Sequence, residues 1–166
     1  MLLSTHILVL THGADVCIDV AQTHLSKLEH IQHYFVRRLL GLPTNSLLVV
    51  FFTETGLLPL KFQRLLVALN YLNYLVNLPP SRLARKALED SITLDRCSKH
   101  SWVRDLRTTI ANLTPAVTFP DLGNLNVGLV NNLLKGVQSA IKLALQNELE
   151  SNQKLYLLHH RLEIKY

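Results

Sequence analysis

The sequence PLKFQRLLVALNYLNYLVN, residues 59–77, predicts a long helix that is apolar on more than one face. Its main stripe repeats every three or four residues, the period of an α-helix, and consists of Phe62, Leu65, Leu66, Leu69, Leu72 and Val76. A second side, formed by Val67, Tyr71 and Leu75, is apolar as well. Such a helix is stable only when other elements cover it. We therefore expect it at the centre of the fold, with Pro59 in its first turn.

Five further helices are predicted around this central one, over residues 20–40, 47–52, 81–91, 101–113 and 129–150. The first of these carries one apolar stripe that we expect to be buried, formed by Leu28, Ile31, Phe35, Leu39 and Leu42. Gly41, followed closely by a proline, predicts where this helix ends. The run at residues 47–52 is apolar on every side, so we expect a short buried helix closed by Gly56, or else a strand.

Helix starts are predicted from side-chain oxygens that can accept a bond from the first free backbone N–H groups. The candidates are Asp19 or Ser26 for the first helix, Asn45 or Ser46 for the second, Ser81 for the fourth and Ser101 for the fifth. Near the chain ends, residues 7–10 indicate a buried strand or a helical turn, and residues 155–166 a last helix or a frayed end.

Length and composition set the architecture. The chain has 166 residues, about the size of one domain, and 37 of them are leucine. That apolar content excludes disorder, and no apolar run approaches the roughly 18–20 residues that span a bilayer. We predict an all-α bundle of about six helices, with a short N-terminal strand-like segment as an alternative. Residues 114–128 are rich in Pro, Gly and Asn and are expected to link residues 1–113 to a C-terminal helical segment, residues 129–166.

Positive charge is concentrated in the middle of the chain. The net charge is +5, and residues 37–107 hold eleven Lys and Arg against five Asp and Glu. An excess of this kind favours an anionic partner such as RNA or an RNA–DNA duplex, although a solvated surface is the simpler explanation. The residues that we expect to contact phosphates are Arg37, Arg38, Lys61, Arg64, Arg104 and Arg107. Tyr71, Tyr74 and Trp102 could stack on bases or pack between helices.

Residue patterns for catalysis or metal binding are absent from the sequence. Cys17 and Cys97 lie too far apart for a metal knuckle and form no disulfide framework, which favours a reducing, intracellular compartment, nucleus or cytoplasm. His30 and His33 share a helix face, but no spacing supplies the third and fourth ligands of a metal site. We therefore expect no catalytic residue, no metal and no cofactor.

Four stretches of the chain carry a resemblance to a known family: residues 11–16, THGADV; residues 28–42, LEHIQHYFVRRLLGL; residues 52–60, FTETGLLPL; and residues 81–106, which include SWVRDL. In this order they resemble the segment downstream of the polymerase palm in LINE-type non-LTR retroelement reverse transcriptases. Residues 11–16 are similar to its Tyr-Gly-x-Glu segment, with His12 and Asp15 in place of Tyr and Glu, and residues 52–60 resemble its Glu-x-Gly-x-x-Pro-Leu turn. Residues 81–106 resemble the version common in fungal elements. The resemblance covers about residues 1–113.

The resemblance implies a helical thumb and connector that help to hold the template–primer duplex. The palm, with its Asp-Asp motif for two metal ions, has no counterpart here, so we expect no polymerase activity and no other enzyme activity. The chain is expected to be a non-catalytic fragment of a retroelement reading frame with residual, sequence-independent affinity for nucleic acid. The alternative is a helical protein-interaction module, or a vestigial reading frame without a nucleic-acid role, whose exposed leucine faces bind the missing palm domain or a second copy.

Overall fold

The computed structural model describes residues 8–18, 21–121 and 125–151, and within these residues the fold is all-α, without strands, as predicted. After a helical turn at residues 8–11 come six helices: α2 (Gln22–Leu40), α3 (Leu48–Thr55), α4 (Leu60–Asn77), α5 (Leu83–Arg96), α6 (Trp102–Leu113) and α7 (Val127–Ser151). The strand alternatives at residues 8–10 and 47–52 are therefore wrong, whereas the alternatives for residues 155–166 lie outside the described residues.

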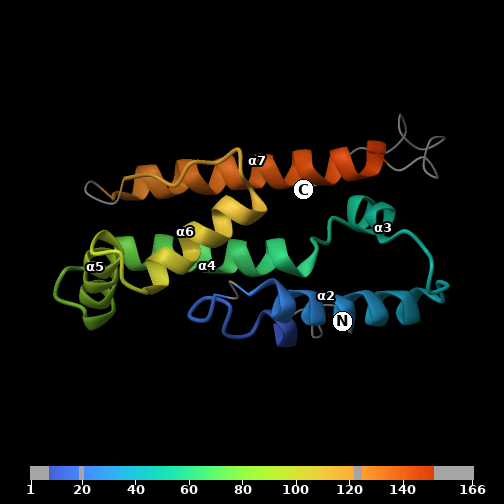
Figure 1. Ribbon diagram of the computed structural model, residues 1–166, viewed down its shortest axis with the longest axis horizontal. Coiled ribbons are helices and arrows are strands. Elements are labelled where there is room, and N and C mark those ends of the chain that lie inside the picture. The colour runs from blue at the N-terminus through green and yellow to red at the C-terminus, as the bar shows by residue number, and fades with distance from the viewer. Residues whose placement is uncertain (1–7, 19–20, 122–124, 152–166) are drawn as a thin grey trace.

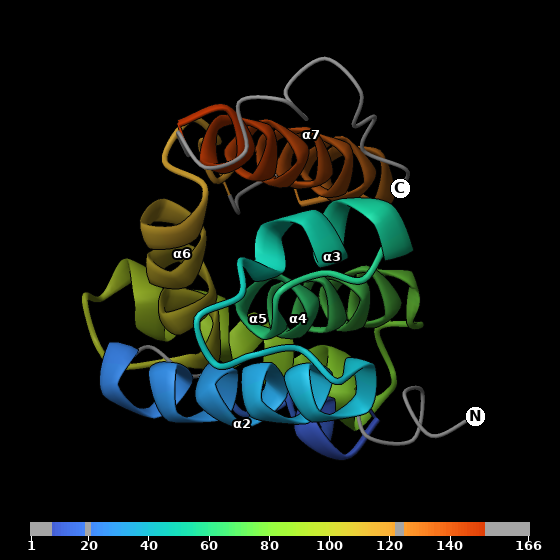
Figure 2. The same ribbon diagram turned by 90° about the vertical axis from the view of Figure 1, so that its right-hand side faces the viewer.

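Helix α4 occupies the centre of the molecule, as its apolar faces predict. It packs against α7 on one side and α2 on the other, and against α5 and α6 (Figure 1). Turned by 90°, the bundle shows α3 lying between α7 and α2 (Figure 2). The main core is built from the buried side chains of α4, α5, α6 and α7, among them Leu69, Leu72, Leu106 and Val137. Residues 114–126 connect α6 to α7, and Val117 and Phe119 of this connection pack against the main core.

Helix α3 joins α2 to α7 through two smaller clusters. Phe52 and Leu48 pack with Val36 of α2, while Val49 packs with Leu149 of α7. Both surroundings are apolar, which explains why the run at residues 47–52 is hydrophobic on every side. The expectation that this segment is a short buried helix closed by Gly56 is confirmed.

The stripe of α2 that was predicted to be buried is exposed at Ile31, Leu39 and Leu42 and only half-buried at Leu28 and Phe35, so the prediction is wrong for three of its five residues. The buried residues of this helix are Leu25, Gln32 and Val36, whereas Ile31 is 46% exposed and Leu39 is 44% exposed. Gln32 explains the rotation because its amide enters the protein and binds the backbone before α4. Its Oε1 accepts a hydrogen bond from Leu60 N at 2.9 Å, and its Nε2 donates to Leu58 O at 3.2 Å. Because Pro59 provides no side-chain cap, Gln32 satisfies a free N–H at the start of α4.

Most of the predicted caps are wrong, and Pro59, which was predicted in the first turn of α4, stands just before that helix. The predicted ends at Gly41 and Gly56 are right, whereas α5 continues to Arg96, beyond the end predicted near residue 91. Ser101 caps α6 by accepting a bond from Arg104 N at 3.2 Å. Three other helices begin without a side-chain cap. Helix α2 begins after Ala21 and not after the predicted Ser26. Helix α3 begins after Leu47 in place of Asn45 or Ser46, and α5 after Arg82 in place of Ser81. The alternative cap Asp19 lies outside the described residues.

Gly41 ends α2 in the left-handed conformation, with φ of 63°. A Cβ at this position would meet no atom within 4 Å, so Gly41→Ala is expected to lower the free energy of unfolding by about 1 kcal/mol through backbone strain alone. The matched control is Gly136→Ala within α7, where the added Cβ would make an ordinary contact of 3.7 Å with Val117. It is expected to stabilise the protein by roughly 0.5–1 kcal/mol. Urea denaturation measures the free energy of unfolding of both variants. Changes of the same sign in the two variants would contradict the prediction.

Candidate interaction surfaces

The first pair of predicted phosphate contacts lies at the end of α2. Arg37 is half-buried, and its Nη2 donates to Ser46 O at 3.0 Å, which ties the helix end to the connection before α3. Arg38 is exposed, and its Nη1 donates to the hydroxyl of Tyr34 one turn earlier, at 3.2 Å. Arg37 therefore has a structural contact, whereas Arg38 stands on the surface beside an exposed aromatic ring.

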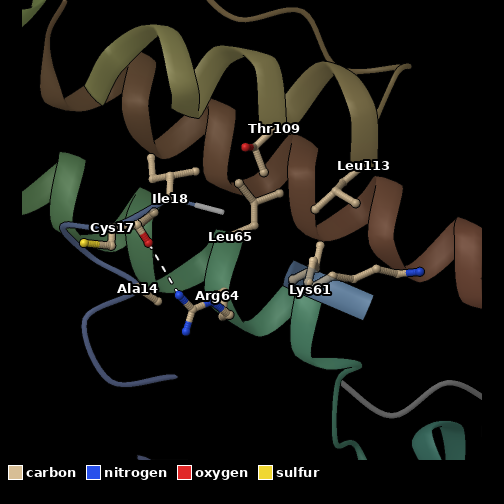
Figure 3. Close-up of a pocket in the computed structure, with 10 residues that line it drawn as sticks. Ala14, Cys17, Ile18, Lys61, Arg64, Leu65, Thr109 and Leu113 are labelled. Carbon is tan, nitrogen blue, oxygen red and sulfur yellow. Dashed lines mark hydrogen bonds between the residues drawn. The ribbon is translucent and has the colours of Figure 1, made fainter. Parts of the chain in front are cut away.

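The second pair lies in the first turns of α4. Lys61 Nζ is 3.9 Å from Glu29 Oε1 on α2. Arg64 holds the N-terminal segment: its Nη1 donates to Leu10 O at 2.7 Å and its Nη2 to Cys17 O at 3.5 Å, the bond drawn dashed in Figure 3. Both cations connect α4 to other parts of the chain.

The third pair lies on α6. Arg104 Nη1 donates to Ser98 O, beside the turn that ends α5. Arg107 Nη2 lies 2.6 Å from the nearly buried carboxylate of Asp95, and its guanidinium stands over the ring of Phe119. Among the six cations of these three pairs, Arg38 differs from the others. Its described hydrogen bond is exposed and joins it to a residue of its own helix.

The aromatic residues considered for base stacking lie partly between helices. Trp102 donates from Nε1 to Asp15 O at 3.0 Å, a contact that holds the N-terminal segment against α6. Tyr71 packs edge-on against the indole of Trp102 with ring centroids 5.9 Å apart, and Tyr74 is the exposed member. These contacts support packing between helices for Tyr71 and Trp102.

Two titratable groups on the inner side of α2 have shifted pKa values. Burial raises the pKa of Glu29 above its ordinary 4.5, and Lys61 only partly counteracts this. Burial lowers the pKa of His33 below 6.5, and the positive charges of Arg37, His30 and Lys61 lower it further. The His33 ring also lies against Phe52, with centroids 6.0 Å apart. Both side chains lie where α2 packs against its neighbours.

Acid is expected to destabilise the protein through His33. Unfolded His33 binds a proton near its ordinary pKa of 6.5, whereas the folded imidazole resists protonation, so the free energy of unfolding falls as the pH drops through 6.5 towards the lower folded pKa. The raised pKa of Glu29 acts in the opposite direction in a window just above 4.5, so the measurement stays between about pH 8 and about pH 5.5. His33→Gln is expected to flatten the slope of stability against pH in that range. The same substitution at the exposed His24 serves as the control, and an unchanged slope in His33→Gln would refute the prediction.

The outer face of α2 is the surface formed by Ile31, Tyr34, Arg38 and Leu39 together with Leu42, which follows the helix. Arg38 is exposed, and the exposed fractions of the other four side chains run from 36% for Leu42 to 60% for Tyr34. Ile31, Leu39 and Leu42 belong to the stripe that the sequence predicted to be buried, and the other two members, Leu28 and Phe35, are half-buried. Apolar side chains left exposed along one periodic stripe are typical of a surface that binds another molecule. The apolar period of this face was visible in the sequence, but the sequence did not show that the face points to the solvent.

A small cavity lies between the N-terminal segment, α2, α4 and α6, lined by residues that include Arg64, Leu65 and Thr109 (Figure 3). Its volume is about 20 Å³, enough for about one water molecule and too small for a substrate. The described residues include no group of three or more His, Cys, Asp or Glu side chains that could hold a metal ion. Among the described helices, none combines the length and apolarity required to cross a membrane.

No family model matches the chain, and neither a curated protein nor a solved structure shows significant similarity to it.

Proposed function

We propose that the chain is a non-catalytic helical module that binds another protein through the outer face of α2. The observation that carries this proposal is the exposure of Ile31, Leu39 and Leu42 on one periodic stripe. Burial of such side chains against a partner contributes roughly 25 cal/mol per Å² of apolar surface.

The resemblance to the post-palm region of LINE-type reverse transcriptases supports the same proposal. In that family the thumb and connector pack beside other domains, so an apolar face that another protein surface covers is expected of such a segment. The polymerase chemistry itself has no counterpart in this sequence, so the proposed role is binding and not catalysis.

Binding to RNA or an RNA–DNA duplex is the second candidate. It is favoured by the exposed Arg38 and by further exposed cations on and after α5, such as Lys86, Arg96 and Lys99. It is weakened by the contacts of Arg37, Arg64, Arg104 and Arg107, whose guanidinium groups bind backbone carbonyls or Asp95. Such binding would fall steeply with salt because it depends on the release of counterions.

Selection of peptides tests the proposal. A library of displayed amphipathic helices is selected on the whole chain, and each binder is retested on the variant Ile31→Asp/Leu39→Asp. The matched control is Leu83→Asp, at a leucine of α5 that is 82% exposed. We expect the α2 variant to weaken binding at least about tenfold and the control to have no effect. Peptides that bind the Ile31→Asp/Leu39→Asp variant as tightly as the unchanged chain would contradict the proposal, provided that circular dichroism shows both variants to be folded.

A further inference from the structure

The charged side chains that α2 itself places beside its outer face are both positive. Lys27 precedes Ile31 by one helical turn, and Arg38 stands beside Tyr34; both cations are exposed. The single acidic residue of α2, Glu29, is half-buried on the inner side and pairs with Lys61. An apolar stripe with a basic border therefore has no carboxylate on its own helix to balance it.

The guanidinium of Arg38 has donors available for an acidic group. One of its five N–H donors binds the Tyr34 hydroxyl, and the described residues give its guanidinium no carboxylate partner. An arginine held by a neighbouring side chain pairs well with a carboxylate, because the planar fork can donate two parallel hydrogen bonds. Ile31 and Leu42 lie on the same side of the helix as Arg38, so one partner surface could fill the stripe and reach this cation.

We infer that the partner of the outer face of α2 is an acidic amphipathic protein segment, with apolar side chains next to Glu or Asp. This inference rests on the proposed function. A second copy of the chain fits less well, because two α2 helices packed face to face would bring Arg38 near Lys27 or Arg38 of the copy, and like charges across an interface cost affinity. A nucleic acid could pair with Arg38, but its sugar–phosphate surface would not bury Ile31, Leu39 and Leu42.

Two matched peptides test the inference. Both are amphipathic helices of about 18 residues, long enough to be partly helical alone, with the same leucine stripe. One carries Glu beside the stripe and the other Lys. Titration of each into the whole chain is expected to show at least about tenfold tighter binding of the Glu peptide, and the preference should shrink between about 50 mM and about 500 mM salt. In Lys27→Glu/Arg38→Glu, whose substituted side chains are exposed, the preference should disappear or reverse.

The outcomes separate the two proposals. Equal binding of both peptides, lost in Ile31→Asp/Leu39→Asp, would leave the interaction module standing and overturn the acidic partner. Binding of neither peptide would overturn both. Binding of a labelled RNA–DNA hybrid that depends on Lys27 and Arg38, with neither peptide bound, would replace the protein partner by a nucleic acid.

Discussion

Leu72→Ala is expected to lower the free energy of unfolding by about 3–4 kcal/mol. The side chain lies in the middle of α4 with no exposed surface, within the core that α4 shares with α5, α6 and α7. Truncation removes buried methyl groups and leaves a cavity that four packed helices cannot easily close. Urea denaturation followed by circular dichroism measures the change.

The matched control for this substitution is Leu83→Ala on α5. Leu83 is 82% exposed, so the same truncation there is expected to change stability by no more than about 0.5 kcal/mol. A loss below about 1 kcal/mol in Leu72→Ala, or equal losses in both variants, would contradict the central position of α4.

Gln32→Ala is expected to cost about 2–3 kcal/mol of stability, an unusual loss for a polar side chain on a helix. The substitution leaves the N–H of Leu60 without its 2.9 Å acceptor in a buried position, and it removes one of two donors to Leu58 O. The cost of an unsatisfied buried group exceeds the small net gain of an ordinary hydrogen bond.

Gln63→Ala is the control for Gln32→Ala. Gln63 Nε2 also donates to Leu58 O, at 2.6 Å, but that carbonyl keeps its bond from Gln32 when Gln63 is removed. We expect Gln63→Ala to cost no more than about 1 kcal/mol. If Gln63→Ala proved as damaging as Gln32→Ala, the role of Gln32 in starting α4 would be wrong.

Much of the fold follows from hydrophobic period and backbone chemistry. The central position of α4 could be predicted because its side chains are apolar on several faces, and only a surrounded helix tolerates that. The ends at Gly41 and Gly56 could be predicted because glycine adopts positive φ without strain. The starts of the helices were harder to predict, because α2, α3 and α5 begin without a side-chain cap and their sequences therefore carry no local signal for the start.

The face that α2 buries could not be predicted from local sequence. Period alone favoured the stripe through Ile31 and Leu39, and the competing set of Leu25, Gln32 and Val36 contains an amide in its middle. Gln32 becomes an inward residue only through Leu58 and Leu60, 26 and 28 positions further along the chain. A hydrogen bond between distant segments thus determined which stripe remained exposed, and with it the candidate site.

The contacts of the basic residues could not be predicted from the local sequence either. Their clustering in the sequence suggested a surface for phosphates, yet a local excess of charge does not reveal whether a guanidinium faces solvent. Arg64 binds carbonyls of Leu10 and Cys17, and Arg107 pairs with Asp95, contacts that only the folded chain creates. Arg38 and Arg107 are both exposed, but the described hydrogen bond of Arg38 stays within its own helix, whereas Arg107 is paired with Asp95.

The outer face of α2 is proposed to recognise a protein. The most direct measurement is a methyl NMR spectrum of Ile31, Leu39 and Leu42 in the whole chain, recorded while the Glu-bordered peptide is added and, in a parallel sample, while an RNA–DNA hybrid is added. We expect these three methyl signals to shift with the peptide and to stay in place with the hybrid. Signals that move with the hybrid but not with the peptide would contradict the claim.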